Sequence, residues 1–240
     1  MRVLDAFLVA PGEAGTNELA RRTGINASTV SRLLATLVSG GLVSYRPETG
    51  RYRLGPQLIR LANHALSEID LRDLARPHLV ALEAQTGETA TISVAGGGEA
   101  ITVDFVSSSS AVASVARIGR PSVLHATATG KVMLAFAPGA APDIELEAFT
   151  DRTIVTAKKL TREIGDVRRH GWAEAVRERD PDLNAIAAPV FGSRGELAGI
   201  LGVQGPASRF KRGRREAALP RLLEAATALS ASLGYNPHTE

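Results

Sequence analysis

Two short amphipathic segments near the N-terminus, separated by three or four residues that include a glycine, constrain the fold more than any other feature of the sequence. The first can be capped by Thr16 or Asn17 and ends at Gly24, because glycine readily adopts the left-handed conformation that closes a helix. The second follows Asn26, another capping residue, and carries apolar side chains at helical spacing: Val30, Leu33, Leu34, Leu37 and Val38. Two helices joined by so short a turn predict a helix-turn-helix.

The first turns of the second helix carry small, polar and basic side chains: Ser28, Thr29, Ser31 and Arg32. In a helix-turn-helix these positions enter the major groove, where hydroxyls bond phosphates or bases and arginine bonds the edge of a guanine. Ser and Thr at a helix start also commonly cap the helix, and the sequence leaves both roles open. With Thr16, these four are the candidate DNA-contact residues of the helices.

A basic hairpin is predicted directly after the two helices. A strand begins at Leu42, residues 47–50 form a turn, and residues 51–54 form the return strand, in which apolar and basic residues alternate. The arms carry three arginines that can follow phosphates or enter the minor groove: Arg46, Arg51 and Arg53. We expect Arg51 to add affinity for any DNA and Arg32 to add sequence specificity. A hairpin in this position predicts the winged form of the motif.

The charge distribution agrees with a DNA-binding N-terminal region. The whole chain has a formal charge of only +3, but residues 1–60 hold eight arginines and four acidic residues, a net charge of +4. Residues 61–240 hold 20 basic and 21 acidic residues, a net charge of −1. The excess positive charge is therefore concentrated where a polyanion would bind, although arginines that merely solubilise the surface remain an alternative.

Several classes of protein are disfavoured by what the sequence lacks. The absence of cysteine excludes disulfides, thiolate metal sites and cysteine nucleophiles, and fits the cytoplasm. The N-terminus does not resemble a signal peptide, and no apolar run is long enough to span a membrane. Gly130-Lys131 lacks the flanking residues of a phosphate-binding loop, the five histidines lack metal-ligand spacing, and no serine lies in a nucleophile elbow. We therefore expect no enzyme activity, catalytic residue, metal or cofactor.

The second half of the chain alternates strands and helices. Strands are expected at residues 90–94, 101–105, 112–117, 172–176, 184–191 and 197–204, with helices at 126–137, 160–170 and a C-terminal segment. Two helical stripes precede them, at residues 58–69 and 71–82, and Pro77 is expected to start or kink a helix. Strands in hairpins with helices at the ends predict an α+β domain and not a parallel dinucleotide-binding sheet.

The stretch LARRTGINASTVSRLLATLVSGGLVSYRPETGRYRLG resembles the winged helix-turn-helix of the IclR family of bacterial transcriptional regulators. The similarity continues through GETATISV, RIGRPSVLHATATGKVMLAF and AIAAPVFGSRGELAGILGVQGPASRF, in the family's order. It implies a winged helix-turn-helix at 1–56, a linker helix at 57–72, and a GAF-like effector-binding and oligomerisation domain at 73–240. It also implies homodimers or homotetramers on a double-stranded operator, with DNA binding modulated by a small effector.

An effector site is expected at the helix that begins near Ala126, because free N–H groups and the helix dipole favour an anion. Thr127 and Thr129 add hydroxyls, and Gly130 would let a ligand approach the backbone, although capping and close packing explain these residues equally well. By resemblance, the backbone at Ala128 and Thr129 holds an acidic ligand, and the opposite wall comprises Asn184, Ala185, Gly202 and Gln204. Asn184 and Gln204 could equally bond loop backbone.

The expected effector is an organic acid. The small residues Ala185 and Gly202 would leave room for a bulky or aromatic one. The rival interpretation is a ligand-binding protein whose N-terminal helical domain contacts protein and not DNA.

Overall fold

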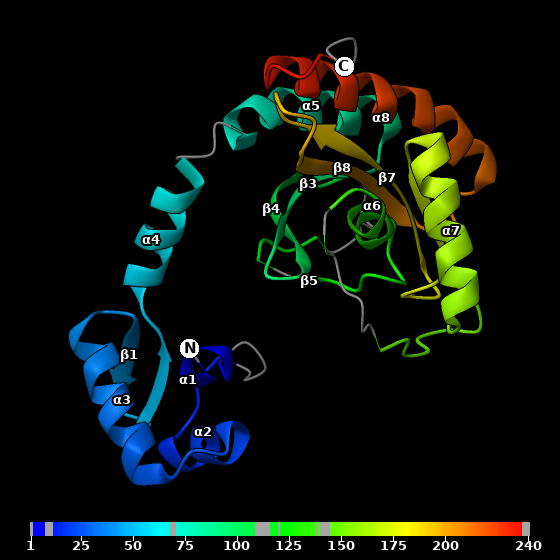
Figure 1. Ribbon diagram of the computed structural model, residues 1–240. Helices are drawn as coiled ribbons and strands as arrows, with labels where there is room; N and C mark the ends of the chain where they lie inside the picture. Colours follow the sequence, from blue (N-terminus) through cyan, green and yellow to red (C-terminus); the bar gives the residue numbers. More distant parts are fainter. Residues whose placement is uncertain are drawn as a thin grey trace. The chain divides into compact units, whose positions relative to one another are not determined.

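The computed structural model describes residues 2–7, 12–67, 71–108, 116–119, 121–137, 139 and 145–236. The chain divides into two compact units, Met1–Ile69 and Asp70–Glu240 (Figure 1). Among the described residues, no helix is both long and apolar enough to cross a membrane.

The first unit is a small helical domain with a two-stranded hairpin (Figure 1). Its elements are α1 (Arg2–Asp5), α2 (Thr16–Thr23), α3 (Ala27–Ser39), β1 (Val43–Arg46), β2 (Arg51–Leu54) and α4 (Pro56–Ser67). The strands are antiparallel, with Val43 opposite Leu54, and Ala14 forms an isolated bridge to Tyr52. The core contains Leu19, Val30 and Leu34, so the predicted apolar stripe of α3 faces inward except at Leu33. The winged helix-turn-helix is confirmed.

The ends of α2 and the buried face of α3 differ in part from the sequence prediction. The N-cap of α2 is Gly15, with no side-chain cap, so neither Thr16 nor Asn17 has the expected capping role. Leu33 is exposed although it was assigned to the apolar stripe, because the buried face of α3 is narrower than the sequence pattern. Gly24 closes α2 in the left-handed conformation, with φ at 69°, as expected.

The second unit is built on one six-stranded antiparallel sheet with the strand order β5-β4-β3-β8-β7-β6. The strands are β3 (Thr89–Gly96), β4 (Glu99–Val106), β5 (Pro121–Ser122), β6 (Ala173–Val176), β7 (Leu183–Phe191) and β8 (Leu197–Pro206). The helices are α5 (Leu71–Thr86), α6 (Ala128–Phe136), α7 (Ala157–His170) and α8 (Arg212–Ser232). In Figure 1, α5 and α8 lie together on one side of the sheet, and α6 lies on the other. The α+β class is confirmed.

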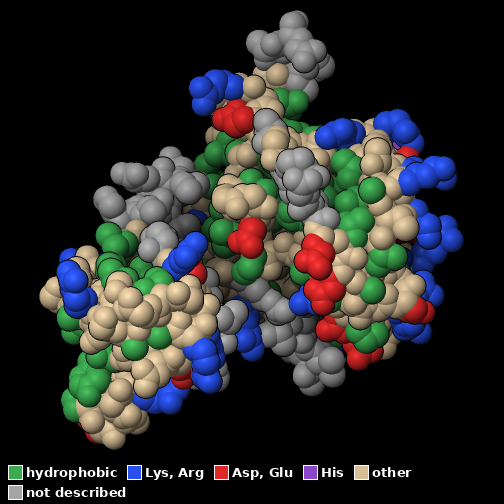
Figure 2. Space-filling view, turned by 60° about the horizontal axis from the view of Figure 1, so that its bottom comes forward, with side chains coloured by type: hydrophobic (Ala, Val, Ile, Leu, Met, Phe, Trp, Pro, Cys, Tyr) green, Lys and Arg blue, Asp and Glu red, His purple; other side chains and the backbone are tan. Residues whose placement is uncertain are grey.

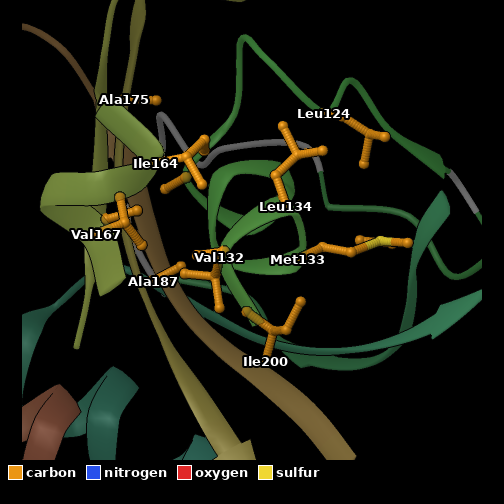
Figure 3. Close-up of a cluster of buried hydrophobic side chains, with 13 residues drawn as sticks. Leu124, Val132, Met133, Leu134, Ile164, Val167, Ala175, Ala187 and Ile200 are labelled. Atoms are coloured by element: carbon orange, nitrogen blue, oxygen red, sulfur yellow. The ribbon is translucent and has the colours of Figure 1, made fainter. Parts of the chain in front are cut away.

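The core on the α6 side is made by small residues of the sheet and larger residues of the helices. Figure 3 shows Val132, Met133 and Leu134 of α6 among Ile164 and Val167 of α7 and the sheet residues Ala175, Ala187 and Ile200. Alanines on the strands let α6 approach the sheet closely. This packing determines where the N-terminus of α6 lies on the sheet.

Two details of the second unit differ from the sequence prediction. Residues 112–115 of the expected third strand lie outside the described residues, residues 116–117 are not in a strand, and β5 at Pro121–Ser122 pairs with β4 instead. Pro77 lies inside α5 and does not start a helix.

Candidate functional sites

The polar residues of α3 are presented to solvent. Ser28, Thr29, Ser31 and Arg32 are all exposed. Asn26 is the N-cap: its side-chain oxygen accepts hydrogen bonds from the backbone N–H of Thr29 at 2.8 Å and from the hydroxyl of Ser28 at 2.9 Å. Within the described part of the chain, the Arg32 guanidinium has no hydrogen-bond or ion-pair partner. The cap is thus supplied by Asn26 and not by the side chain of Ser28 or Thr29. Arg32 has no partner that it must leave before it contacts a ligand.

The three hairpin arginines differ in what they contact. Arg53 is exposed and has no partner among the described residues. Arg46 forms an exposed ion pair with Glu13 at 3.3 Å. Arg51 donates to Glu18 of α2 at 2.6 Å and to the carbonyl of Glu13 at 3.1 Å. Arg51 therefore ties the hairpin to α2, a structural contact that the sequence analysis did not foresee. On the face shown in Figure 2, blue Lys and Arg side chains are distributed over the smaller unit at the lower left.

Glu18 is the carboxylate that joins α2 to the hairpin. It also pairs with Arg22 at 2.7 Å. Partial burial acts to raise the pKa of Glu18, but a hydrogen bond from the N–H of Gly15 and the charges of Arg22 and Arg51 outweigh it, so this pKa lies below its usual range. Thr16, the remaining candidate DNA-contact residue of the helices, is the first residue of α2 and is half-buried.

The stabilising effect of Glu18 is expected to disappear in acid. A carboxyl whose pKa is lower in the folded state stabilises the fold above its unfolded pKa and ceases to do so as pH falls through the folded pKa. At neutral pH, the hairpin of the Glu18→Gln variant should therefore be less stable than the hairpin of the parent chain. This difference in stability should become smaller as the pH falls below the ordinary range of glutamate pKa values. The NMR amide signals of β1 and β2, followed during denaturation, measure it. A difference that is constant with pH would contradict the assignment.

The second unit contains a cavity of about 610 Å³ between the sheet and the N-terminal end of α6. This volume lies within the range typical of small-molecule sites. Hydroxyl groups of Thr91, Thr102 and Ser122 and the amide of Gln204 contribute to the lining. The cavity therefore offers many hydrogen-bonding groups together with small apolar ones.

The N-terminus of α6 supplies backbone donors to this cavity. The Thr127 hydroxyl is the cap: it accepts from the N–H of Gly130 at 3.0 Å and donates to the carbonyl of Val123 at 2.8 Å. The first bond of the helix runs from Lys131 N–H to the Thr127 carbonyl at 3.0 Å. The N–H groups of Ala128 and Thr129 precede that bond, and both residues line the cavity. An anion can bind these groups.

Five of the eight residues expected at the effector site line this one cavity: Thr127, Ala128, Thr129, Ala185 and Gln204. Ala185 and Gln204 are paired opposite each other on β7 and β8. Gly202 lies next to the lining, since a Cβ there would be 2.8 Å from the hydroxyl of Thr91. The Thr127 hydroxyl is already used by the cap and is not a free donor.

Gly130 and Asn184 do not line the cavity. A Cβ at Gly130 would lie 2.7 Å from the Val123 carbonyl and closer still to Leu124, so this glycine serves helix packing and not ligand approach. The Asn184 amide is buried and donates to the Phe210 carbonyl at 2.9 Å, a loop-backbone contact. For both residues the structural alternative from the sequence analysis describes the observed contacts.

The sequence analysis missed the charged residues of the cavity lining, which lie at Arg117, Glu178, Arg179, Asp180 and Asp182. Four of them, all but Arg117, come from residues 177–182, the segment between β6 and β7. The alternation of acidic and basic residues there was the one signal in the sequence that pointed to them.

Behind this segment lies a buried ion cluster. Lys131 of α6 is 1% exposed, and its ammonium donates to Glu178 at 2.8 Å, to Glu163 at 2.9 Å and to the carbonyl of Glu174 at 2.9 Å. Burial raises the pKa of the Glu178 carboxyl above its usual range, although Lys131 acts in the opposite direction. The cluster joins α6, α7 and the segment after β6.

Comparison with known proteins assigns both units to one family. Residues 1–47 match the IclR helix-turn-helix domain, and residues 63–231 match the C-terminal domain of bacterial IclR transcriptional regulators. The chain belongs to the IclR family. It is a DNA-binding transcriptional regulator whose DNA binding is modulated by a small-molecule effector.

Named relatives of this IclR regulator cover almost its full length. It is 29% identical to the HTH-type transcriptional regulator XynR of Escherichia coli K12, over 98% of this chain and 95% of XynR. It is 32% identical to the regulator BhcR of Paracoccus denitrificans, over 95% of this chain and 83% of BhcR.

A solved IclR homologue of Microbacterium hydrocarbonoxydans, complexed with 4-hydroxybenzoate, is similar at 25% identity. The match has a TM-score of 0.80 and covers 97% of this chain and 96% of that one.

Proposed function

We propose that α3 reads the operator through Ser28, Thr29, Ser31 and Arg32. Arg53 contacts phosphates directly, and Arg46 does so by exchanging its exposed ion pair with Glu13 for a phosphate. The observation that carries this proposal is the exposure of a partner-free Arg32 on the helix that follows the tight turn. A free guanidinium can donate two parallel hydrogen bonds to guanine, whereas a paired one must first give up its partner. Arg51, which is bound to Glu18, acts mainly by holding the hairpin on α2.

Replacing Arg32 with alanine is expected to cost about 1–3 kcal/mol of affinity for the operator and little for random duplex DNA. Arg53→Ala should weaken both and reduce the slope of log affinity against log salt by about 0.9, because one phosphate contact is lost. The measurement is DNA binding by the full chain over a series of salt concentrations.

Arg51→Ala is the matched comparison on the same hairpin. It should lower the thermal stability of the first unit, with a smaller change in salt slope than Arg53→Ala, because its charge is already paired. Retention of random DNA that did not weaken as salt rises would contradict the assignment of phosphate contacts to the hairpin arginines.

We propose further that the cavity of the second unit binds an organic or aromatic acid. The N–H groups of Ala128 and Thr129 provide donors for a carboxylate, Gln204 provides an amide, and the small residues Ala185 and Gly202 leave room for a ring. The complex of the Microbacterium homologue with 4-hydroxybenzoate supports an aromatic acid as one member of the class. A thermal-shift screen of carboxylic acids tests this, since a ligand at about 100 times its dissociation constant stabilises by about 2.7 kcal/mol.

The proposed domain organisation is a DNA-binding domain at 1–56, a linker helix at 57–72 and an effector-binding and oligomerisation domain at 73–240. The proposed location of the regulator is the cytoplasm. A homodimer or homotetramer would match a two-fold operator. Effector binding would shift the population between arrangements of the DNA-binding domains. Light scattering of the full chain with and without operator DNA measures the assembly.

A further inference from the structure

The segment after β6 has a strained backbone that is held by two threonines. Arg177 has a φ of +57°, the only positive φ of a non-glycine residue in the part of the chain that the structure describes. The Thr150 hydroxyl donates to the Arg177 carbonyl at 2.6 Å, and the Thr153 hydroxyl donates to the Glu178 carbonyl at 2.6 Å. Such a conformation costs free energy and persists only where the surroundings enforce it. The segment is therefore fixed in one shape.

This fixed shape separates two neighbouring charges. Glu178 is directed to the buried ammonium of Lys131. The guanidinium carbon of the next residue, Arg179, lies 3.9 Å from the centre of the Phe149 ring. Phe149 in turn stacks on His125, a residue 1% exposed that lies just before α6 and whose Nε2 is 2.9 Å from the Glu147 carbonyl. Arg179 thus rests on a stack of rings beside the helix whose N-terminus lines the cavity.

Arg179 is half-buried and lines the cavity, yet its guanidinium has no hydrogen-bond or ion-pair partner among the described residues. The comparable half-buried or buried arginines of this unit are paired: Arg209 with Glu88 at 2.7 Å and Arg215 with Glu174 at 3.1 Å. The guanidinium presents donors suited to a carboxylate, and stacking holds its plane before a ligand arrives. A preorganised, unpaired cation in a cavity wall indicates an anionic ligand.

The remaining charges of the lining favour a ligand with one negative charge over a ligand with two. Glu178, Asp180 and Asp182 contribute carboxylates, and only Glu178 is paired with a lysine. Asp180 and Asp182 are exposed, and a second carboxylate on a ligand would be repelled by them. Arg117 is the other cation of the lining and is exposed.

We propose that Arg179 is the charge-recognition residue of the effector cavity and that Phe149 positions it, so that the cavity selects monocarboxylates over their neutral amides and over dicarboxylates. The inference rests on the proposed effector role of the cavity. It adds to that role a side chain with a full positive charge, whereas the backbone N–H groups of Ala128 and Thr129 and the helix dipole supply only partial charges.

The test measures binding of matched ligands to the full chain without DNA, by thermal shift and calorimetry. The probes are benzoate and 4-hydroxybenzoate, the corresponding amides, and terephthalate as the dicarboxylate. The parent chain should prefer each monocarboxylate to its amide by about 10- to 100-fold, the effect of a charge-assisted hydrogen bond. It should also bind benzoate more tightly than terephthalate, and equal binding of the two would contradict selection against a second carboxylate. Arg179→Gln should abolish that preference while leaving amide binding unchanged. Phe149→Leu should reduce it, and Arg152→Gln, an exposed arginine outside the lining, should keep it.

Two outcomes separate failure of this inference from failure of the proposed function. If Arg179→Gln keeps the preference for acid over amide, that preference comes from Arg117 or from the backbone donors, and its loss in Arg117→Gln would identify Arg117. In either case Arg179 is not the charge-recognition residue, and the cavity remains an effector site. If neither acids nor amides stabilise the parent chain, the proposed aromatic-acid site fails, and the assignment of Arg179 fails with it.

Discussion

Replacing Lys131 with methionine is expected to lower the free energy of unfolding of the second unit by about 3–5 kcal/mol. The buried ammonium donates to two carboxylates and one carbonyl, and its removal leaves Glu178, which is 8% exposed, as an uncompensated buried charge. Trp172, the only tryptophan, immediately precedes β6 and reports on this unit by fluorescence during denaturation. The loss should also loosen the cavity wall, since Glu178 precedes Arg179.

The double variant Lys131→Met with Glu178→Gln is the matched control, because it removes the orphaned charge together with its partner. It should recover a substantial part of the lost stability, since a neutral amide costs less to bury than a carboxylate.

The cost of Lys131→Met should also depend on pH. Burial raises the pKa of Glu178 in the folded state, so the fold accommodates the neutral carboxyl more easily than the carboxylate. This contribution to the free energy of unfolding is present at low pH and is lost as the pH rises through the folded-state pKa. The penalty of Lys131→Met should therefore grow with pH. A penalty below about 1 kcal/mol at neutral pH would show that the cluster is not what secures α6.

Local signals predicted the DNA-binding unit well because its architecture depends on neighbours in the sequence. Asn26 caps α3 three residues ahead of the N–H it binds, and Gly24 closes α2 where glycine was expected. The role of Arg51 could not be predicted in this way, because its partner Glu18 lies 33 residues earlier and only the folded hairpin brings them together.

The sequence predicted the part of the cavity that depends on residues close together in the chain, the N-terminus of α6, but not the charged wall after β6. The α6 N-terminus has a recognisable sequence, with a capping threonine before small residues. The wall around Glu178 and Arg179 depends on Lys131, 47 residues away from Glu178, and on Thr150 and Thr153, which hold a strained backbone. Such contacts leave no periodicity in the sequence, and an alternating run of charges is equally typical of a solvated loop.

The second large effect is expected from Gly130→Ala, which should destabilise the second unit by about 3 kcal/mol and weaken effector binding. A methyl group there would lie 2.7 Å from the Val123 carbonyl and would also overlap Leu124, and these are backbone atoms that cannot rotate away. The segment before α6 would have to move, and with it the cap at Thr127 and the free N–H groups of Ala128 and Thr129. Tryptophan fluorescence during denaturation and the acid screen measure the two effects.

Gly165→Ala is the control that separates this steric effect from the general preference of helices for alanine. Gly165 lies within α7, and a Cβ at that position would have no neighbouring atom within 4 Å. Alanine there should stabilise the unit by about 0.5–1 kcal/mol, because glycine loses more backbone freedom on folding. The same substitution is thus expected to have opposite signs in two helices of one domain. Equal effects at the two sites would mean that the loop before α6 can yield, and that the close approach of Gly130 does not determine the position of the α6 N-terminus.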